Sequence, residues 1–193
     1  MKKLLALALV VMVAGSAVAQ DDNMMGMFFS DTVFTDETTN HTNLFAPFNG
    51  YIVLLNATVE TVGGYEVGIG IPATVFLLGV TGENGWTNFG GNTNHLCGYQ
   101  VPLPAMPEGT VLATINMLYT GTDIIGIEFG PAEPATIPGV PVIADGANPD
   151  DVYACQLTAD ANGEFPNLVA TINGGGIVAT ENHTLSDVKA LFE

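Results

Sequence analysis

The stretch Thr110-Val-Leu-Ala-Thr-Ile-Asn-Met-Leu-Tyr-Thr120 places an apolar side chain at every second position. Successive side chains of a β-strand point to opposite faces, so this period of two predicts a strand with one face on a core. The apolar face is expected to line that core and consists of Val111, Ala113, Ile115, Met117 and Tyr119. The opposite face carries Leu112, Thr114, Asn116 and Leu118.

The rest of the chain repeats this pattern in short segments. They are rich in Val, Ile, Leu, Phe or Tyr and are bounded by Gly, Pro, Asn or Asp, which is typical of strands joined by turns. Further strands are expected at 26–30, 50–58, 65–71, 74–80, 97–101, 124–129, 140–144, 152–157, 168–172 and 177–180. Residues 187–192, capped by Ser186, are expected to form a short C-terminal helix. Many strands and little helix predict an all-β fold, an antiparallel β-sandwich of two sheets.

The N-terminal residues have the layout of an export signal. Lys2 and Lys3 precede an apolar run at 4–14, and the small residues Ala17-Val18-Ala19 follow it. This pattern predicts a signal peptide over 1–19 and a single β-sandwich domain over 20–193. The apolar run is shorter than the roughly 20 residues that span a bilayer, so no membrane insertion is expected. The product is therefore expected to be secreted, extracellular or periplasmic, in a bacterium.

The chain is hydrophobic in composition, strongly acidic and nearly without cations. Its 48% of hydrophobic residues exclude an intrinsically disordered protein. Three Lys and no Arg stand against 20 Asp plus Glu, for a net charge of −17 at pH 7. Nucleic-acid binding needs cations on phosphates, so this balance excludes a nucleic-acid partner. Two explanations of the acidity stay open: solubility, or carboxylates that converge on Ca²⁺.

Cys97 and Cys155 are the two cysteines of the chain. An exported protein meets an oxidising compartment, so a disulfide between them is expected. In the chain-entropy model, closing that loop would stabilise the fold by about 4 kcal/mol.

The sequence lacks several catalytic signatures. After residue 19 the serines are Ser30 and Ser186, neither in a Gly-x-Ser-x-Gly motif, and no Gly-Lys pair exists for a phosphate-binding loop. His41, His95 and His183 each stand alone in a loop context. That context favours solvated histidines over metal ligands or catalytic bases.

Glu66 and Glu128 are the carboxylates that are hardest to assign. Each lies on the strand face opposite to the apolar side chains of its expected strand, beside glycines that leave room for another group. If the two strands are neighbours, the pair would suit a cation or the hydrolysis of a glycosidic bond. The alternative is that both face water on the outer face of a sheet.

Two acidic turns offer further oxygen ligands. Asp145, Asp150 and Asp151 lie in the first turn, and Asp160 lies in the second. Ca²⁺ would be the cofactor held there, and ordinary turn chemistry is the alternative explanation.

The longest polar stretch, residues 81–108, carries aromatic and amide side chains: Trp86, Asn88, Phe89, Asn92 and Tyr99. Aromatic rings against sugar faces and amides against hydroxyls form glycan-binding surfaces, so these residues are candidate ligand contacts. The alternative is that the rings close one end of the sandwich. Exposure of Trp86 and Phe89 distinguishes the two explanations.

Two passages resemble cohesin-like and carbohydrate-binding-module-like β-sandwiches. The first runs Tyr51-Ile-Val-Leu-Leu-Asn-Ala-Thr58 into Gly63-Gly-Tyr-Glu-Val-Gly-Ile69 and a turn at Pro72. The second is Gly109-Thr-Val-Leu-Ala-Thr-Ile115, followed by residues 124–129. The resemblance implies a cohesin-like or immunoglobulin-like sandwich that serves as a non-catalytic module for protein assembly, adhesion or glycan contact. We therefore expect an extracellular protein or glycan as partner; the alternative is a carbohydrate-active hydrolase that uses the pair Glu66 and Glu128.

Overall fold

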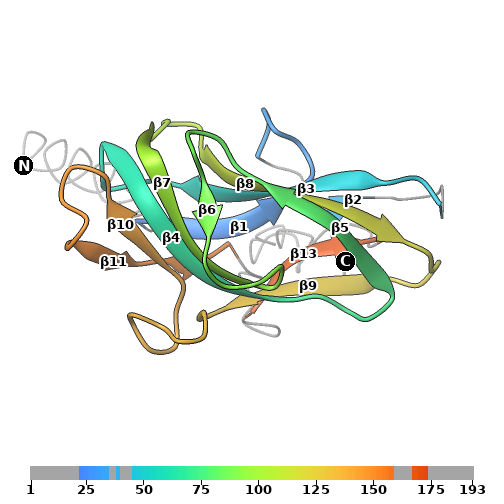
Figure 1. Ribbon diagram of the computed structural model, residues 1–193. Helices are drawn as coiled ribbons and strands as arrows, with labels where there is room; N and C mark the ends of the chain where they lie inside the picture. The colour runs from blue at the N-terminus through green and yellow to red at the C-terminus, as the bar shows by residue number, and fades with distance from the viewer. Residues whose placement is uncertain (1–21, 35–37, 40–44, 159–166, 174–193) are drawn as a thin grey trace, which may run out of the picture.

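The computed structural model describes residues 22–34, 38–39, 45–158 and 167–173. These residues form two β-sheets packed face to face (Figure 1). The all-β, two-sheet architecture expected from the sequence is confirmed. Among the described residues, no helix is long and apolar enough to cross a membrane.

The first sheet, here called sheet A, has five strands in the order β12-β1-β3-β8-β5. Their bounds are Met24–Phe28 for β1, Phe48–Leu55 for β3, Val75–Thr81 for β5, Thr110–Tyr119 for β8 and Gln156–Leu157 for β12. Neighbouring strands are antiparallel except at one edge, where β12 runs parallel to β1. The strand β8 therefore lies inside this sheet, between β3 and β5.

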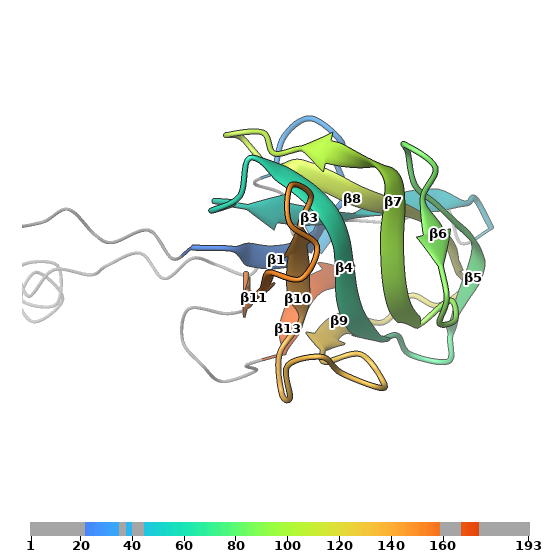
Figure 2. The same ribbon diagram turned by 60° about the vertical axis from the view of Figure 1, so that its left-hand side comes forward.

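The second sheet, sheet B, is organised around β4. The strand β7 pairs with one edge of β4, and β10 and β9 follow each other along the other edge. Figure 2 shows β4, β7 and β6 side by side, with β3 and β8 in the layer behind them. The bounds in this sheet are Thr38–Thr39 for β2, Thr61–Gly70 for β4, Thr87–Asn88 for β6, Asn94–Pro104 for β7, Ile125–Gly130 for β9, Val142–Asp145 for β10, Val152–Ala154 for β11 and Leu168–Ile172 for β13.

The inward face of β8 follows the predicted alternation with one interruption. Ala113, Ile115, Met117 and Tyr119 are buried as expected, whereas Val111 is only half-buried and Leu112 is buried in its place. The cause is a β-bulge: on β3, Ile52 faces Ala113 and Val53 faces Val111, so Leu112 has no partner across the ladder. An extra residue in one strand resets the alternation by one position.

Most predicted strands are observed, with one change and two omissions. The strand expected at 152–157 is split at the buried residue Cys155. There the chain passes from β11, which pairs with β10 in sheet B, to β12, which pairs with β1 in sheet A. The two-residue strands β2 and β6 were not predicted, since so short a segment has no period. The expected signal peptide at 1–19, the expected strand at 177–180 and the expected helix at 187–192 lie outside the described residues.

His95 is fully buried on β7, so the expectation of a solvated loop histidine is wrong. Its Nδ1 lies 2.9 Å from the Tyr65 hydroxyl oxygen, and its Nε2 lies 3.3 Å from the carbonyl oxygen of Asn92. A carbonyl only accepts, so Nε2 carries the proton and Nδ1 accepts from Tyr65. Trp86 donates its Nε1–H to the same hydroxyl oxygen over 3.4 Å. Burial lowers the pKa of His95 to about 4.

The expected disulfide is absent, because Cys97 and Cys155 are both buried free thiols. Across sheet B, Cys97 faces Tyr65, Tyr65 faces Ile143, and Ile143 faces Tyr153. Three strand spacings amount to roughly 14 Å, and Cys155 lies two residues further along the chain. A disulfide needs Cα atoms within about 7 Å, so the fold holds the two cysteines too far apart.

Both cysteines are expected to titrate as free thiols when the protein is unfolded without reductant. Burial raises the pKa of Cys97 to about 11 and that of Cys155 to about 12, so the reactive thiolate is scarce in the native state at pH 7. Ellman titration should give slow reaction in buffer and two thiols per chain in concentrated guanidinium chloride. A reduced and desalted sample is the control. Fewer thiols in the unreduced sample than in this control would contradict the structure.

His95 is expected to make folding stability depend on pH between its two pKa values, about 4 in the folded state and about 6.5 in the unfolded chain. In that window the unfolded state binds more protons, so stability falls as pH falls. The loss from this residue is about 3 kcal/mol between pH 7 and pH 4. Denaturant unfolding of the wild type and of His95→Gln at several pH values gives two curves of unfolding free energy against pH. The difference between the curves is the contribution of His95, because the carboxylates contribute equally to both. Tyr119→Phe removes a partly buried hydrogen bond, from the Tyr119 hydroxyl to the Asp123 carbonyl, and should lower stability equally at every pH. Parallel curves for the wild type and His95→Gln would refute the prediction.

Candidate functional site

A groove of about 820 Å³ opens where β5 leaves the side of β8. The pairing between these strands runs from Val75 opposite Tyr119 to Thr81 opposite Thr114. Beyond Thr81 the chain turns away and enters β6 of sheet B. The first part of β8, residues 110–113, then lines the groove with no strand on that side among the described residues.

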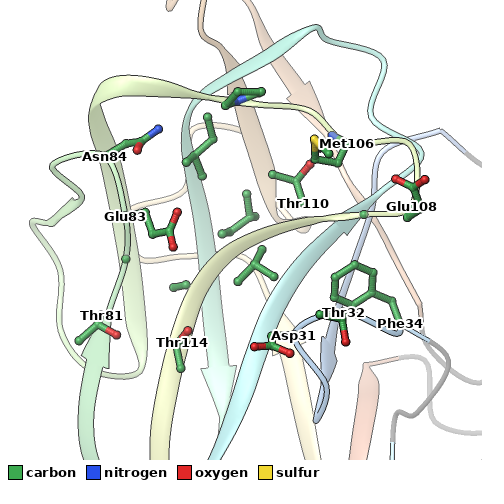
Figure 3. Close-up of a pocket in the computed structure, with 17 residues that line it drawn as sticks. Asp31, Thr32, Phe34, Thr81, Glu83, Asn84, Met106, Glu108, Thr110 and Thr114 are labelled. Atoms are coloured by element: carbon green, nitrogen blue, oxygen red, sulfur yellow. Dashed lines mark hydrogen bonds between the residues drawn. The ribbon is translucent and has the colours of Figure 1, made fainter.

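The groove has an apolar floor and an acidic rim. Phe34 and Val111, both half-buried, and the exposed Met106 contribute apolar surface, and Thr114 contributes a hydroxyl group. Asp31, Glu83 and Glu108 lie around it from three separate segments, as Figure 3 shows. All three carboxylates are exposed. No Lys or Arg occurs among the described residues, so none of these carboxylates meets a cation of the described fold.

Local turns place the rim residues. Asn84 and Gly85 both have positive φ, and the Trp86 amide donates to the Glu83 carbonyl over 2.9 Å. Two consecutive left-handed residues in such a turn define type I′, which Asn-Gly favours. Glu108 precedes Gly109, whose φ of 134° suits glycine and whose amide donates to the Met106 carbonyl. The rim carboxylates were missed from the sequence, although Asn84-Gly85 is a detectable turn signal beside one of them.

The predicted ligand contacts do not form one surface. Trp86 is half-buried with its Nε1–H on Tyr65, and Tyr99 is buried with its hydroxyl donating to the Leu112 carbonyl over 2.7 Å. Asn88 accepts from the amides of Gly90 and Leu96, so it holds the β6–β7 hairpin. Two of the set are exposed, namely Phe89, at 78%, and Asn92. Tyr99 therefore packs within the sandwich, and Trp86 packs against its core.

Glu66 holds the loop between β9 and β10. Its carboxylate accepts from the Thr136 amide over 2.9 Å and from the Thr136 hydroxyl over 2.6 Å. Asn94 fixes the same loop by donating to the Glu133 carbonyl and accepting from the Glu133 amide. The loop thus crosses the outer face of β4 and β7.

Glu128 lies on the same outer face, but the structure does not bring it to Glu66. The strands β4 and β9 do pair, with Glu128 opposite Gly70. Gly70 is four residues from Glu66, so the two glutamate Cα atoms are roughly 14 Å apart. Glycosidases need carboxyl groups about 5 to 10 Å apart. Glu128 lines a separate hollow that also contains Glu133.

The first acidic turn uses its side chains internally. Asp145 accepts from the Ala147 amide over 2.8 Å, and Asp151 accepts from the Asn148 side-chain amide over 2.7 Å. Asp150 is exposed, and Asp160 lies outside the described residues. Within the described ranges, no three His, Cys, Asp or Glu residues gather in a way that would hold a metal ion.

Removing the Glu66 carboxylate is expected to release the loop at 131–141. Glu66→Ala loses both hydrogen bonds to Thr136, so the unfolding free energy should fall by about 1 kcal/mol. Hydrogen exchange in that loop should also rise. Glu128→Ala is the matched control, because it removes the same charge from an exposed position and should change stability by less than about 0.5 kcal/mol. Equal effects of the two variants would contradict the anchoring role.

Comparison with known proteins gives two similar structures at low identity. No family model and no curated protein matches the chain. A cohesin module from a Clostridium perfringens ATCC13124 family 33 glycoside hydrolase is similar with a TM-score of 0.46 and 10% identity, covering 70% of this chain and 91% of that one. The sixth cohesin of Acetivibrio cellulolyticus scaffoldin B, solved in complex with a Cel5 dockerin mutant, is similar with a TM-score of 0.47 and 11% identity, covering 79% and 99%. The chain thus resembles cohesin modules weakly.

Proposed function

We propose that this protein is a non-catalytic interaction module that binds a protein partner outside the cytoplasm. The observation that carries the proposal is the groove beside β8, which joins a concave apolar floor to a polar rim. Protein-binding patches combine those two features, with apolar contacts at the centre and polar groups around them. The export signal read at 1–19 supports a site of action outside the cytoplasm.

The buried titratable groups support a structural rather than a catalytic role. A general acid or base works best with a pKa near the operating pH. Burial moves the pKa of His95 down to about 4 and that of Cys97 up to about 11. It also raises the pKa values of Tyr65 and Tyr99. All four side chains lie in the core rather than on the groove.

Filling the groove is expected to abolish partner binding. Thr114→Trp places an indole on the outward face of β8 beside the rim, whereas Thr122→Trp adds the same side chain at an exposed position outside the groove. Immobilised residues 20–193 should retain a partner from the envelope proteins of the source organism, and Thr114→Trp should lose it while Thr122→Trp keeps it. A glycan array probed with and without Ca²⁺ runs in parallel.

Two results would overturn the proposed function. The first is retention that Thr114→Trp leaves intact, because binding would then use another surface. The second is strong glycan binding without any retained protein. Unfolding curves of both variants verify that each is folded.

A further inference from the structure

Within the described part of the chain, residues 110–113 of β8 form a sheet edge that no strand covers, and this edge lies in the groove. β8 pairs with β3 from Thr110 to Met117, but it pairs with β5 only from Thr114 to Tyr119. Residues 110–113 thus have a strand on one side only within the described fold. A free edge presents backbone donors and acceptors to any extended chain that reaches it.

The structure fixes the gap open rather than leaving β5 free to fill it. The Asn84 carbonyl accepts from the Val101 amide over 3.1 Å, which ties the turn after β5 to β7 in sheet B. The type I′ turn at Asn84 and Gly85 then leads into β6, which pairs with β7. The strand β5 therefore cannot continue along β8 without breaking these contacts.

The free edge is short, so side-chain contacts must contribute much of the affinity. Four residues of strand span roughly 13 Å. The Leu112 carbonyl already accepts from Tyr99, and the Thr110 hydroxyl already accepts from the Met106 amide over 2.9 Å. A docked strand would alternate side chains between the apolar floor and the acidic rim.

The charge of the rim specifies the partner. Asp31, Glu83 and Glu108 surround the groove, and the described residues contain neither Lys nor Arg to neutralise them. A second copy would bring a net charge of −17 of the same sign, which opposes self-pairing at this edge. A basic chain would meet complementary charge from three directions.

We infer that the groove binds an extended peptide segment of alternating basic and apolar residues, which adds a strand to β8 at residues 110–113. This inference rests on the proposed function and names the chemistry of its partner. The peptide backbone pairs with the free edge, its apolar side chains pack on the floor, and its Lys or Arg side chains meet the three rim carboxylates.

The test uses a fluorescein-labelled peptide of alternating Lys and Val as the probe. Anisotropy titration of residues 20–193 should show binding at low salt that weakens at about 0.3 M salt. A Glu and Val peptide should not bind. The Lys and Val peptide with N-methyl groups on alternate amides should bind much more weakly, because it keeps the charge but cannot pair with the edge. Amide hydrogen exchange should slow at residues 110–113 when the unmodified peptide is bound.

The matched charge variants separate the rim from the overall charge. Glu83→Gln with Glu108→Gln should weaken binding of the probe roughly fivefold to tenfold. Glu128→Gln with Asp150→Asn removes the same charge from exposed positions outside the groove and should change it less than about twofold.

Several outcomes would overturn the inference. If the N-methylated peptide bound as tightly as the unmodified one, strand addition would be excluded. If both double variants weakened binding equally, the effect would come from the overall charge and not from the rim. If spermidine displaced the labelled peptide at the concentration at which the peptide itself binds, the groove would be a site for any polycation. Tighter probe binding by Lys189→Ala would show that the chain's own lysine segment occupies the groove. If the probe fails while Thr114→Trp still abolishes partner retention, the proposed function stands and only the partner chemistry is wrong.

Discussion

The closely packed interface between the two sheets is the constraint on which the rest of the structure depends. The longer strands of both sheets each give one face to it, because side chains of alternate residues are the means by which a sheet reaches a core. On β4 this rule buries Tyr65, Val67 and Ile69 and turns Glu66 outward. On β8 the bulge at Leu112 moves the inward positions by one residue near the strand start, so Leu112 faces the core in place of Val111. At the same bulge the Leu112 carbonyl accepts a hydrogen bond from the Tyr99 hydroxyl. One irregularity therefore buries an apolar side chain and gives a buried hydroxyl group its partner.

The interface also explains why the buried polar side chains are joined by hydrogen bonds. An unpaired polar group in a core costs about 1 to 3 kcal/mol, so each must find a partner there. Tyr65, His95 and Trp86 meet this requirement together, since the tyrosine hydroxyl donates to the imidazole and accepts from the indole. The burial that makes the network necessary also moves the pKa of His95 to about 4, far from the range of a neutral-pH base. A constellation of Tyr, His and Cys that would suggest chemistry in a cleft is here a part of the packing.

Period and turn chemistry predicted most of the architecture, because each is a local property. The strand at 168–172 has the predicted bounds, and most other expected strands differ from the observed ones by a few residues. Long-range relations were not predictable from one chain. The split at Cys155 depends on the chain crossing between sheets, and the distance between Cys97 and Cys155 depends on the order β7-β4-β10-β11. His95 was assigned to a loop because the strand begins at Asn94, three residues before the predicted start. The groove was also missed because it depends on long-range relations: Asp31, Glu83 and Glu108 are far apart in sequence and come together only in the fold.

A free edge and an acidic rim belong together for a physical reason. A bare sheet edge invites pairing with another copy, and natural proteins guard such edges with charge. Carboxylates at Asp31, Glu83 and Glu108 repel every other copy of so acidic a chain, so they protect the edge at residues 110–113 from self-association. The same carboxylates attract a basic chain, without any change in the groove. Guarding by one sign of charge therefore selects a partner of the opposite sign, whereas guarding by proline or by a covering loop would have closed the edge to every partner.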